Sequence, residues 1–340
     1  MIIQAKNIRR TFRSTKKKEG LKGALQLLIH PEYQHHEALK GVSFSIDSGS
    51  FTGLIGANGA GKTTLLKILS GLIPPTSGEA NVLGYEPFKR PLEFRKKIAL
   101  VMGQKAQLWW DLPAIDAFDL LRAIYEIPNP VYRERIHTLA CLLDVEPHLN
   151  TQIRRLSLGE RMKMELIGAL IHWPSVIFLD EPTIGLDVLA AHKLREFLRI
   201  FNQREKATII LTSHNMDDIE RLCSRVLILK SGELIYDGHP AGLTQEGQRT
   251  LRVRLLETPS LKLISEETGI TESLIEQHSE ETMDTDGFYF HIQKDQIVAV
   301  LQALMKRYHI IDMGIEEQSL ERVIQHLYED HQAPLMDRAA

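Results

Sequence analysis

The sequence predicts an α/β fold with a mainly parallel sheet, followed by a small α+β domain. Three observations support this prediction. Short apolar strands alternate with helical segments from residue 2 to about residue 236, the arrangement typical of parallel sheets covered by helices. A glycine-rich loop at 56–63 joins one of these strands to a helix. Beyond about residue 242 the pattern changes to alternating strands and amphipathic helices, which indicates a second folding unit.

The elements of the first unit follow from their periodicity and from the residues that end them. Strands are expected at 2–12, 38–46, 51–55, 97–102, 176–179 and 208–212, and a hairpin at 225–236 turns at Ser231-Gly232. Helices are expected at 62–72, over most of 110–171 and at 189–201. The segment 13–36 interrupts this order. Its lysine run and its apolar stretch at 25–29 fit either a solvated surface excursion or a short amphipathic helix that contacts a membrane or a partner.

The second unit has its own apolar pattern. Strands are expected at 251–255 and 288–292, and helices around 297–304 and 320–327. The predicted organisation is a large first domain at 1–245 with a helical subdomain at about 105–170, a small α+β accessory domain at 246–330, and a flexible tail at 331–340.

Composition limits the class of function. The formal net charge of −3 gives no basic field of the kind that nucleic acid binding leaves, so we expect no nucleic acid partner. The two cysteines, Cys141 and Cys223, form no ligand-spaced cluster and indicate a reducing compartment. The start of the chain lacks the pattern of a secretory signal. The longest apolar stretch, 166–179, contains His172 and Pro174 and is shorter than the ~20 residues of a membrane helix, so a membrane role requires another chain to span the bilayer.

The glycine-rich loop carries the most specific chemical signal. Its residues, Gly-Ala-Asn-Gly-Ala-Gly-Lys-Thr, match the phosphate-binding P-loop between a strand and a helix. Glycines let backbone N–H groups turn toward phosphate oxygens, and the N-terminus of the following helix favours anions. Lys62 is expected to reach the phosphates, and the Thr63 hydroxyl is expected to ligate Mg²⁺. The expected phosphate-binding residues are Gly56, Asn58, Gly59, Ala60, Gly61, Lys62, Thr63 and Thr64.

A second chemical signal, a pair of acidic residues, follows the buried strand 176–179. Asp180 is expected to hold Mg²⁺, as the acid at this place does in P-loop enzymes. Glu181, directly after it, can accept a proton from an attacking water. An apolar strand that ends in two acids is weak evidence alone, because strands often end in solvated carboxylates; its weight comes from the P-loop.

With these motifs and five further elements, residues 1–245 resemble the ATP-binding subunits of ABC transporters. Leu156–Glu160 matches the signature that this family places upstream of the Asp180 strand. Gln104 matches the Q-loop, 185–187 the D-loop and His214 the switch histidine, while Phe12 falls where the family stacks an aromatic ring on adenine. Each match alone is commonplace, and their joint occurrence in the family's order supports the resemblance. It implies the ABC ATPase fold, a P-loop NTPase with a mixed sheet core and a helical subdomain.

The resemblance also implies roles. Two such chains sandwich two ATP molecules, so that Ser157 and Gly159 contact the nucleotide held by the partner and Asp187 communicates across the dimer. Glu181 activates water, His214 holds the γ-phosphate, and Gln104 bridges Mg²⁺ and the water while sensing the membrane subunit. The expected cofactors are ATP and Mg²⁺, and the expected activity is Mg²⁺-dependent hydrolysis coupled to transport.

The implied partners are a second copy or a similar ATPase chain and integral membrane transporter subunits, with the protein cytoplasmic and peripheral on the inner face of the cell membrane. The layout of residues 246–330 is similar to extensions on exporter ATPases and favours export; the cargo is not encoded in this chain. Trp109 and Trp110 are either interface anchors or caps of the helical subdomain core. The signature departs from the usual pattern at Leu158 and Glu160, which affects the geometry of the contact with the partner's nucleotide.

Two other functions compete with transport. One is a soluble ABC ATPase that acts on a cytosolic assembly, but ribosome-acting relatives usually carry two cassettes and DNA-maintenance relatives carry long coiled coils. The other is a nucleotide-dependent switch without hydrolysis, for which Glu181 would be unnecessary.

Overall fold

The computed structural model describes residues 1–15, 33–103, 107–243, 248–257, 259–279, 286–317 and 320–329. The chain divides into two compact units, with the division between Gly238 and His239. The amphipathic helix considered at 25–29 and the predicted tail at 331–340 lie outside the described residues.

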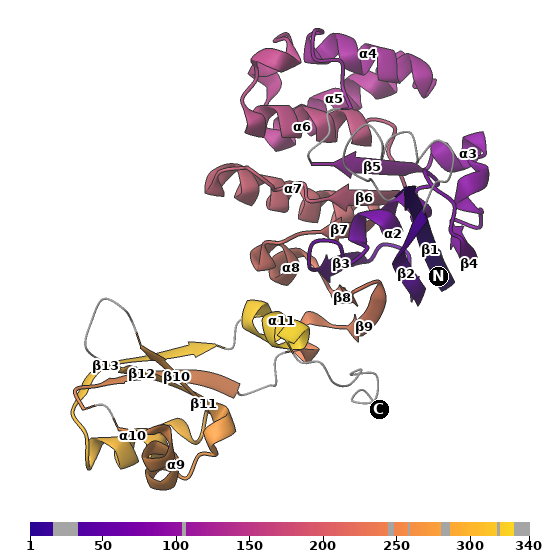
Figure 1. Ribbon diagram of the computed structural model, residues 1–340. Coiled ribbons are helices and arrows are strands. Elements are labelled where there is room, and N and C mark those ends of the chain that lie inside the picture. Colours follow the sequence, from indigo (N-terminus) through magenta and orange to yellow (C-terminus); the bar gives the residue numbers. More distant parts are fainter. Residues whose placement is uncertain are drawn as a thin grey trace, which may run out of the picture. The chain divides into compact units, whose positions relative to one another are not determined.

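The first unit is built on a six-stranded sheet of order β5-β6-β7-β3-β8-β9 (Figure 1). Its first five strands run parallel and β9 pairs antiparallel with β8. The strands are β3 (Phe51–Gly56), β5 (Ile98–Met102), β6 (Val176–Asp180), β7 (Thr208–Thr212), β8 (Arg225–Lys230) and β9 (Glu233–Gly238). The central strands are almost wholly buried, which explains their continuous apolar runs.

A three-stranded antiparallel sheet, β2-β1-β4, packs against this core. It comprises β1 (Ile3–Thr15), β2 (Tyr33–Ile46) and β4 (Ser77–Val82). The first two strands pair from Ile3↔Ile46 out to Thr15↔Tyr33, so the expected excursion at 13–36 begins and ends as the extension of this hairpin. The strand β4 was not expected from the sequence, because it is short, polar and mostly exposed.

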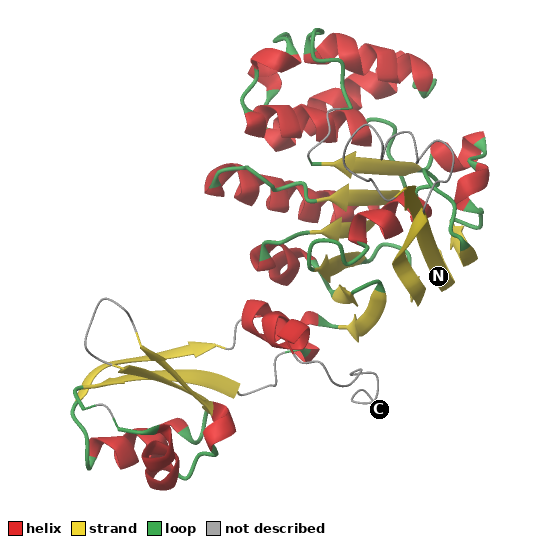
Figure 2. Ribbon diagram, in the orientation of Figure 1, coloured by secondary structure: helices red, strands yellow, loops and turns green. Residues whose placement is uncertain are grey.

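Helices of the first unit cover the sheet and form a group at its β5 side (Figure 2). They are α2 (Lys62–Leu69), α3 (Leu92–Arg95), α4 (Ala114–Ile124), α5 (Asn129–Leu143), α6 (Leu158–Leu170), α7 (Val188–Glu205) and α8 (Met216–Leu222), with 3₁₀ turns η1 (Pro87–Lys89), η2 (Glu146–His148) and η3 (Ile153–Arg155). The core between the two sheets includes Leu65, Leu66 and Leu69 of α2 packed with Leu54 and Phe178. Burial of this apolar face, rather than helix propensity, fixes the short helix α2 behind the glycine-rich loop.

The second unit is a four-stranded antiparallel sheet of order β11-β12-β10-β13 with two helices over one face. Its elements are η4 (Pro240–Gly242), β10 (Gln248–Leu255), α9 (Leu261–Thr268), η5 (Glu272–Leu274), β11 (Ile275–Ser279), β12 (Asp286–Gln293), α10 (Ile297–Met305), β13 (Ile310–Glu317) and α11 (Leu320–Glu329). Leu251 and Val253 of β10 and Phe288 and Phe290 of β12 are fully buried in its separate core. Within the described ranges of both units, no helix combines the length and apolarity needed to cross a bilayer.

Candidate active site

The glycine-rich loop lies at the carboxyl end of β3, the strand between β7 and β8 in the parallel sheet. Gly61 is the N-cap of α2 with φ +106°, and a Cβ there would lie 2.6 Å from the carbonyl oxygen of Ala38. This position therefore requires glycine. The loop leads directly into the N-terminus of α2, where unpaired backbone N–H groups favour an anion such as phosphate.

Lys62 places its ammonium group inside the loop. Its Nζ donates to the carbonyl oxygens of Gly56, at 2.5 Å, and Ala57, at 3.3 Å, and the residue is only 6% exposed. Burial lowers the pKa of this ammonium group, while the negative charges of Glu181 and Asp180 act in the opposite direction. A buried cation facing two carboxylates is suited to an anionic ligand bound in the same loop.

Asp180, at the end of β6, is fixed by two hydroxyl groups. Thr63 Oγ1 donates to its Oδ2 at 2.9 Å, and Thr212 Oγ1 donates to its Oδ1 at 2.7 Å. Carboxylate and hydroxyl oxygens are the ligands that Mg²⁺ prefers. Neighbouring ligands around an octahedral Mg²⁺ stand about 2.9 Å apart for metal–oxygen lengths of about 2.0–2.1 Å. The Thr63–Asp180 pair therefore fits this cation both in donor type and in spacing.

Glu181 lies one residue beyond Asp180 and faces His214. The Nε2 atom of His214 is 2.8 Å from Oε1 of Glu181, and the Glu181 backbone N–H donates to both the carbonyl and the hydroxyl oxygen of Thr212. Glu181 has a φ of +54°, a costly conformation for a residue with a side chain. Gly103 packs on this bend, since a Cβ there would lie 2.2 Å from the Glu181 carbonyl oxygen. The backbone bend aims the carboxylate toward the loop.

The glycine-rich loop, Lys62, Thr63 and Glu181 line one pocket of about 220 Å³, while Asp180 and His214 contact it through Thr63 and Glu181. Its lining consists of Phe12, His36, Ala38, Ala57, Asn58, Gly59, Ala60, Gly61, Lys62, Thr63, Thr64 and Glu181. Phe12 comes from β1 and His36 is its direct neighbour on β2. A larger cavity of about 340 Å³ contains none of these residues. The Glu181 carboxylate, the buried ammonium of Lys62 and the glycine-rich backbone mark the smaller pocket as the site of chemistry.

The residues 156–160 lie at the N-terminus of α6, and none of the predicted residues Ser157, Gly159 and Asp187 lines the described part of this pocket. Ser157 is the N-cap: its Oγ accepts from Glu160 N at 3.3 Å, while Glu160 Oε2 accepts from Ser157 N at 2.9 Å and from its hydroxyl at 2.8 Å. His148 Nε2 lies 3.1 Å from the other Glu160 oxygen. The bonds from Ser157 hold the pKa of Glu160 below its ordinary value. Glu160 therefore serves as half of a capping box.

The D-loop lies beside this helix start. Asp187 is the N-cap of α7 and accepts from Ala190 N at 2.9 Å. Leu158, which is 49% exposed, approaches Gly185: a Cβ on that glycine, with φ +73°, would lie 2.9 Å from the leucine Cδ2. The leucine that departs from the usual signature thus lies against the glycine of the next motif, whose positive φ disfavours any residue with a side chain.

A buried ion pair between Arg195 and Asp218 is hydrogen-bonded to residues close in sequence to Glu181 and His214. Asp218 is fully buried; its Oδ1 accepts from Arg195 Nη1 at 2.7 Å, and its Oδ2 accepts from the hydroxyls of Thr183 and Ser213 at 2.6 Å each. Thr183 follows Glu181 by two residues and Ser213 directly precedes His214. The network therefore connects α7 and α8 to both segments that carry the Glu181–His214 contact.

Gln104 lies outside the described residues. The residues that follow it are fixed: Glu165 of α6 accepts from the N–H groups of Gln107 and Leu108 at 3.1–3.3 Å. Burial raises the pKa of Glu165, and these two N–H donors oppose the shift. Trp109 and Trp110 are each nearly half exposed, and the Arg161 guanidinium lies 4.4 Å from the centre of a Trp110 ring.

Known proteins match this chain over the segments that form the site. The profile of the family described as "ABC transporter" matches residues 39–184, which include the P-loop, the signature and the acidic pair. The ABC transporter ATP-binding protein NatA of Bacillus subtilis is 34% identical over 202 residues, 59% of this chain and 82% of the relative. The chain belongs to the ABC transporter ATP-binding proteins. As a member of this family, it binds and hydrolyses ATP.

Other relatives of this ABC ATPase differ in their described roles. The linearmycin resistance ATP-binding protein LnrL of B. subtilis is 27% identical over 301 residues, 88% of this chain and 96% of the relative. The methionine import ATP-binding protein MetN 2 of Enterococcus faecalis is 30% identical over 245 residues, 71% of each chain. Among solved structures, the ATP-binding cassette MJ0796, dimeric in a post-hydrolysis state with ADP and Pi, aligns with a TM-score of 0.58 and 25% identity over 70% of this chain and 98% of that one.

The structure adds four residues to the site that the sequence motifs did not indicate. They are His36, Thr212, Asp218 and Arg195. His36 belongs to the segment interpreted as an excursion, and only its pairing with Phe12 brings it to the pocket. Thr212 is the last residue of β7 and lies two residues before His214. This position at the end of a strand was the only feature of the sequence that could have indicated its role in the site. Asp218 and Arg195 lie on different helices and carried no pattern of their own.

Proposed function

We propose that this ABC ATPase is one of two paired motor chains that use Mg²⁺-dependent ATP hydrolysis to drive export through separate membrane subunits. One observation carries the proposal: the pocket unites the P-loop, Glu181 and Phe12, whereas Ser157, Gly159 and Asp187 lie outside its described lining. Each chain would carry the P-loop half of a site on one surface and the signature half on another. Two such chains complete two sites when they pair head to tail. The dimeric cassettes among its structural relatives support this arrangement.

Within one chain, the P-loop N–H groups and Lys62 would bind the phosphates, with Thr64 at the start of α2 and Phe12 stacked on the adenine. Thr63 and Asp180 would hold Mg²⁺, together with Gln104 in the family's arrangement. The cation supplies charge neutralisation of the transferred phosphoryl group. Asn58 and Gly59 at the tip of the loop would close over the phosphates through their backbone.

Glu181 is the proposed general base. Its carboxylate is partly exposed, lies at the pocket wall and contacts His214 at 2.8 Å. A water between the bound phosphate and Glu181 would transfer its proton to the carboxylate as it attacks. His214 would then orient both the carboxylate and the phosphate.

The partner chain would supply Ser157 and Gly159 to the γ-phosphate. The capping box leaves the hydroxyl of Ser157 donating to Glu160, so contact with phosphate requires that hydroxyl to turn from the carboxylate. The neighbouring His148 offsets the negative charge of Glu160 when its imidazole is protonated. Asp187, at the N-terminus of α7, would lie at the same dimer interface.

A membrane partner has a candidate docking groove in the larger cavity of about 340 Å³. The cavity lies between α3, β5, α4 and α6, next to Gln107 and Leu108, and its wall includes Leu72, Leu92 and Ile124. These three apolar residues are 40–61% exposed. Exposed apolar side chains gathered at one groove mark an interaction site. An amphipathic helix of a membrane subunit fits such a groove and would keep this chain at the inner face of the membrane.

The similarity to a Nod factor export protein supports export, and the similarity to the resistance protein LnrL reaches the second unit. The 301 aligned residues of the resistance protein LnrL must extend beyond Gly238 into the second unit, because only 238 residues precede it. The Nod factor export ATP-binding protein I of Rhizobium leguminosarum is 35% identical over 205 residues, 60% of this chain and 65% of the relative. The second unit would accordingly be an accessory domain shared with the resistance ATP-binding protein LnrL.

The substitution Glu181→Gln tests the assignment of the base. We expect ATP binding to persist, hydrolysis to fall at least about 100-fold, and ATP-bound dimers to accumulate, because a neutral amide cannot take the proton. Phosphate release and size-exclusion chromatography with ATP measure the two effects. Glu196→Gln, at an exposed position on α7, is the matched control. A Glu181→Gln chain that hydrolyses ATP at the parent rate would exclude Glu181 as the base.

Affinity purification from native membranes tests the transport assignment. A multispanning protein recovered with this chain in stoichiometric amount is expected. Copurification with a cytosolic assembly, and without a membrane subunit, would contradict transport and support a soluble ABC ATPase.

A further inference from the structure

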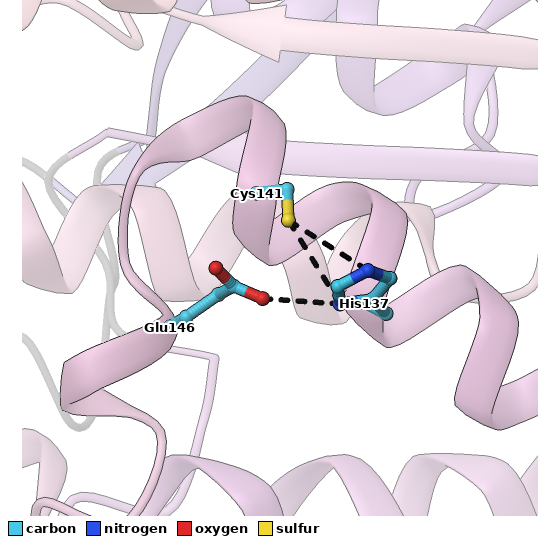
Figure 3. A group of neighbouring side chains, drawn as sticks. All are labelled: His137, Cys141 and Glu146. Carbon is cyan, nitrogen blue, oxygen red and sulfur yellow. Dashed lines mark hydrogen bonds and ion pairs between the residues drawn. The ribbon is translucent and has the colours of Figure 1, made fainter.

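A cluster of metal-ligating side chains lies on the helical subdomain, apart from the nucleotide pocket. His137 and Cys141 are on α5, and Glu146 is the first residue of η2 (Figure 3). The three side chains converge, with one ligand atom from each within 4.8 Å of the others. We propose that they form a binding site for a borderline divalent cation, best matched by Zn²⁺.

The positions follow from local structure. His137 and Cys141 are four residues apart, which places them on one face of the helix in successive turns. The chain then turns at Asp144, which has a left-handed φ of +54°, and Val145 N donates back to the carbonyl oxygen of Ala140 at 3.0 Å. This helix end carries Glu146 back over the same face.

Buried anchors fix the backbone that presents the three ligands. Leu139, Ala140, Leu143 and Val145 are fully buried, while the ligands themselves are exposed. The backbone geometry of the cluster is therefore determined by packing, and a cation can reach the side chains from solvent. Sites on rigid elements hold their ligand geometry better than sites on loops.

The distances fit one small cation. His137 Nδ1 is 3.0 Å from Glu146 Oε1, and Cys141 Sγ is 3.8 Å from His137 Nδ1. Ligand atoms around a tetrahedral zinc stand about 3.3–3.6 Å apart, given metal–ligand lengths of about 2.0–2.3 Å. The third pair, Cys141 Sγ and the Glu146 oxygen, lies within 4.8 Å. Because all three side chains are exposed, rotation about their own bonds would bring the three atoms to the zinc spacing.

The donor set selects the class of cation. Thiolate, imidazole and carboxylate are the three ligand types that protein zinc sites use, whereas Mg²⁺ and Ca²⁺ require oxygen donors. A hydrogen bond to Glu146 and the charge of that carboxylate raise the pKa of the Cys141 thiol. Binding would displace this thiol proton to solvent, form the S–Zn bond and leave the fourth zinc position to water.

The site also lies one 3₁₀ turn from the signature. The turn η2 begins at Glu146 and ends at His148, whose Nε2 contacts Glu160 of the capping box. A cation on Glu146 would therefore tie the end of α5 to the turn that supports the start of α6.

Metal titration of the full-length chain tests the proposal, with thiols kept reduced and Mg²⁺ in excess to occupy the nucleotide site. We expect one equivalent of Zn²⁺ to bind in competition with a chromophoric chelator. Co²⁺ in its place should give a thiolate-to-metal charge-transfer band. Cys141→Ser should abolish the band, and His137→Ala and Glu146→Gln should each weaken zinc binding at least about tenfold. Zn²⁺ should raise the Tm of the parent but not of Cys141→Ser.

Matched controls separate this site from general surface binding. His192→Ala and Glu196→Gln change exposed residues of α7 and should leave zinc affinity unchanged. All five positions are exposed, so folding should survive the substitutions, which circular dichroism checks. Equal zinc affinity in the parent and in Cys141→Ser, or no charge-transfer band in the parent, would overturn the proposal.

Discussion

At the residue scale, two hydroxyl-bearing residues organise the acids of the site. Thr212 donates to Asp180 and accepts from the backbone of Glu181, and Thr63 donates to the other oxygen of Asp180. The Asp180 carboxylate thus has both oxygens satisfied by neighbours on different elements. Such bonding holds a carboxylate in one orientation, which a cation site requires.

Substitution of Asp218 tests how far the Glu181–His214 contact depends on a buried charge. Asp218→Asn removes the negative partner of Arg195, which is itself buried, so we expect the free energy of unfolding to fall by about 2–5 kcal/mol. The rate of hydrolysis should fall more than ATP binding, because Ser213 and Thr183 flank the Glu181–His214 contact. Urea denaturation and steady-state kinetics measure the two effects.

The adjacent Asp217 provides the control. It is exposed, so Asp217→Asn should change neither stability nor rate beyond a few tenths of a kcal/mol. Equal stability of the Asp217 and Asp218 variants would show that the buried pair contributes little.

At the element scale, α6 connects the signature to the cavity beside β5. Its N-terminus is the capping box of Ser157 and Glu160, its middle carries Glu165, and His172 follows its end. His172 stacks on Tyr125 with ring centres 4.0 Å apart and contacts the Ile98 carbonyl oxygen at 3.0 Å. One helix thus joins the signature, the segment after Gln104 and strand β5.

His172 predicts a pH dependence of stability. Burial lowers the pKa of His172 to about 4, whereas the unfolded chain keeps the ordinary value of 6.5. Between these two values the unfolded state binds the proton and the folded state does not. The folded chain should therefore lose stability as pH falls from 6.5 toward 4, with a slope of up to about 1.4 kcal/mol per pH unit from this residue.

His172→Phe keeps an aromatic ring against Tyr125 and removes the titration. Urea unfolding between pH 4.5 and 6.5, a range set by the two pKa values, should give a flatter profile for this variant than for the parent. The exposed His192→Phe is the control and should keep the parent slope. Parallel profiles for all three chains would argue against a buried neutral His172.

At the scale of the whole molecule, the nucleotide pocket and the signature lie on separate parts of one chain. Under the proposed head-to-tail pairing, a monomer presents two incomplete halves. This arrangement predicts that hydrolysis depends on association of two chains.

Specific activity should accordingly rise with protein concentration through the range in which the chain dimerises, and then level off. Phosphate release at a series of concentrations, compared with the dimer fraction from analytical ultracentrifugation, measures the relation. Full specific activity in a sample shown to be monomeric would be incompatible with a shared site.

The sequence by itself determined the parts of this protein whose chemistry resides in contiguous residues. The P-loop was predictable because its cradle is made from backbone groups of consecutive residues behind a buried strand, and Asp180 and Glu181 because a strand end places them together. The alternation of apolar strands and helices likewise indicated the parallel sheet.

Only the tertiary structure decided the parts assembled from separate segments. His36 reaches the pocket through the register of the β1–β2 hairpin, and Asp218 meets Arg195 because α7 and α8 pack together. Cys141 has no second cysteine near it in sequence, yet a helix end brings Glu146 beside it and His137. Side chains of this kind carry no local pattern, because their partners are chosen by the packing of elements rather than by spacing along the chain.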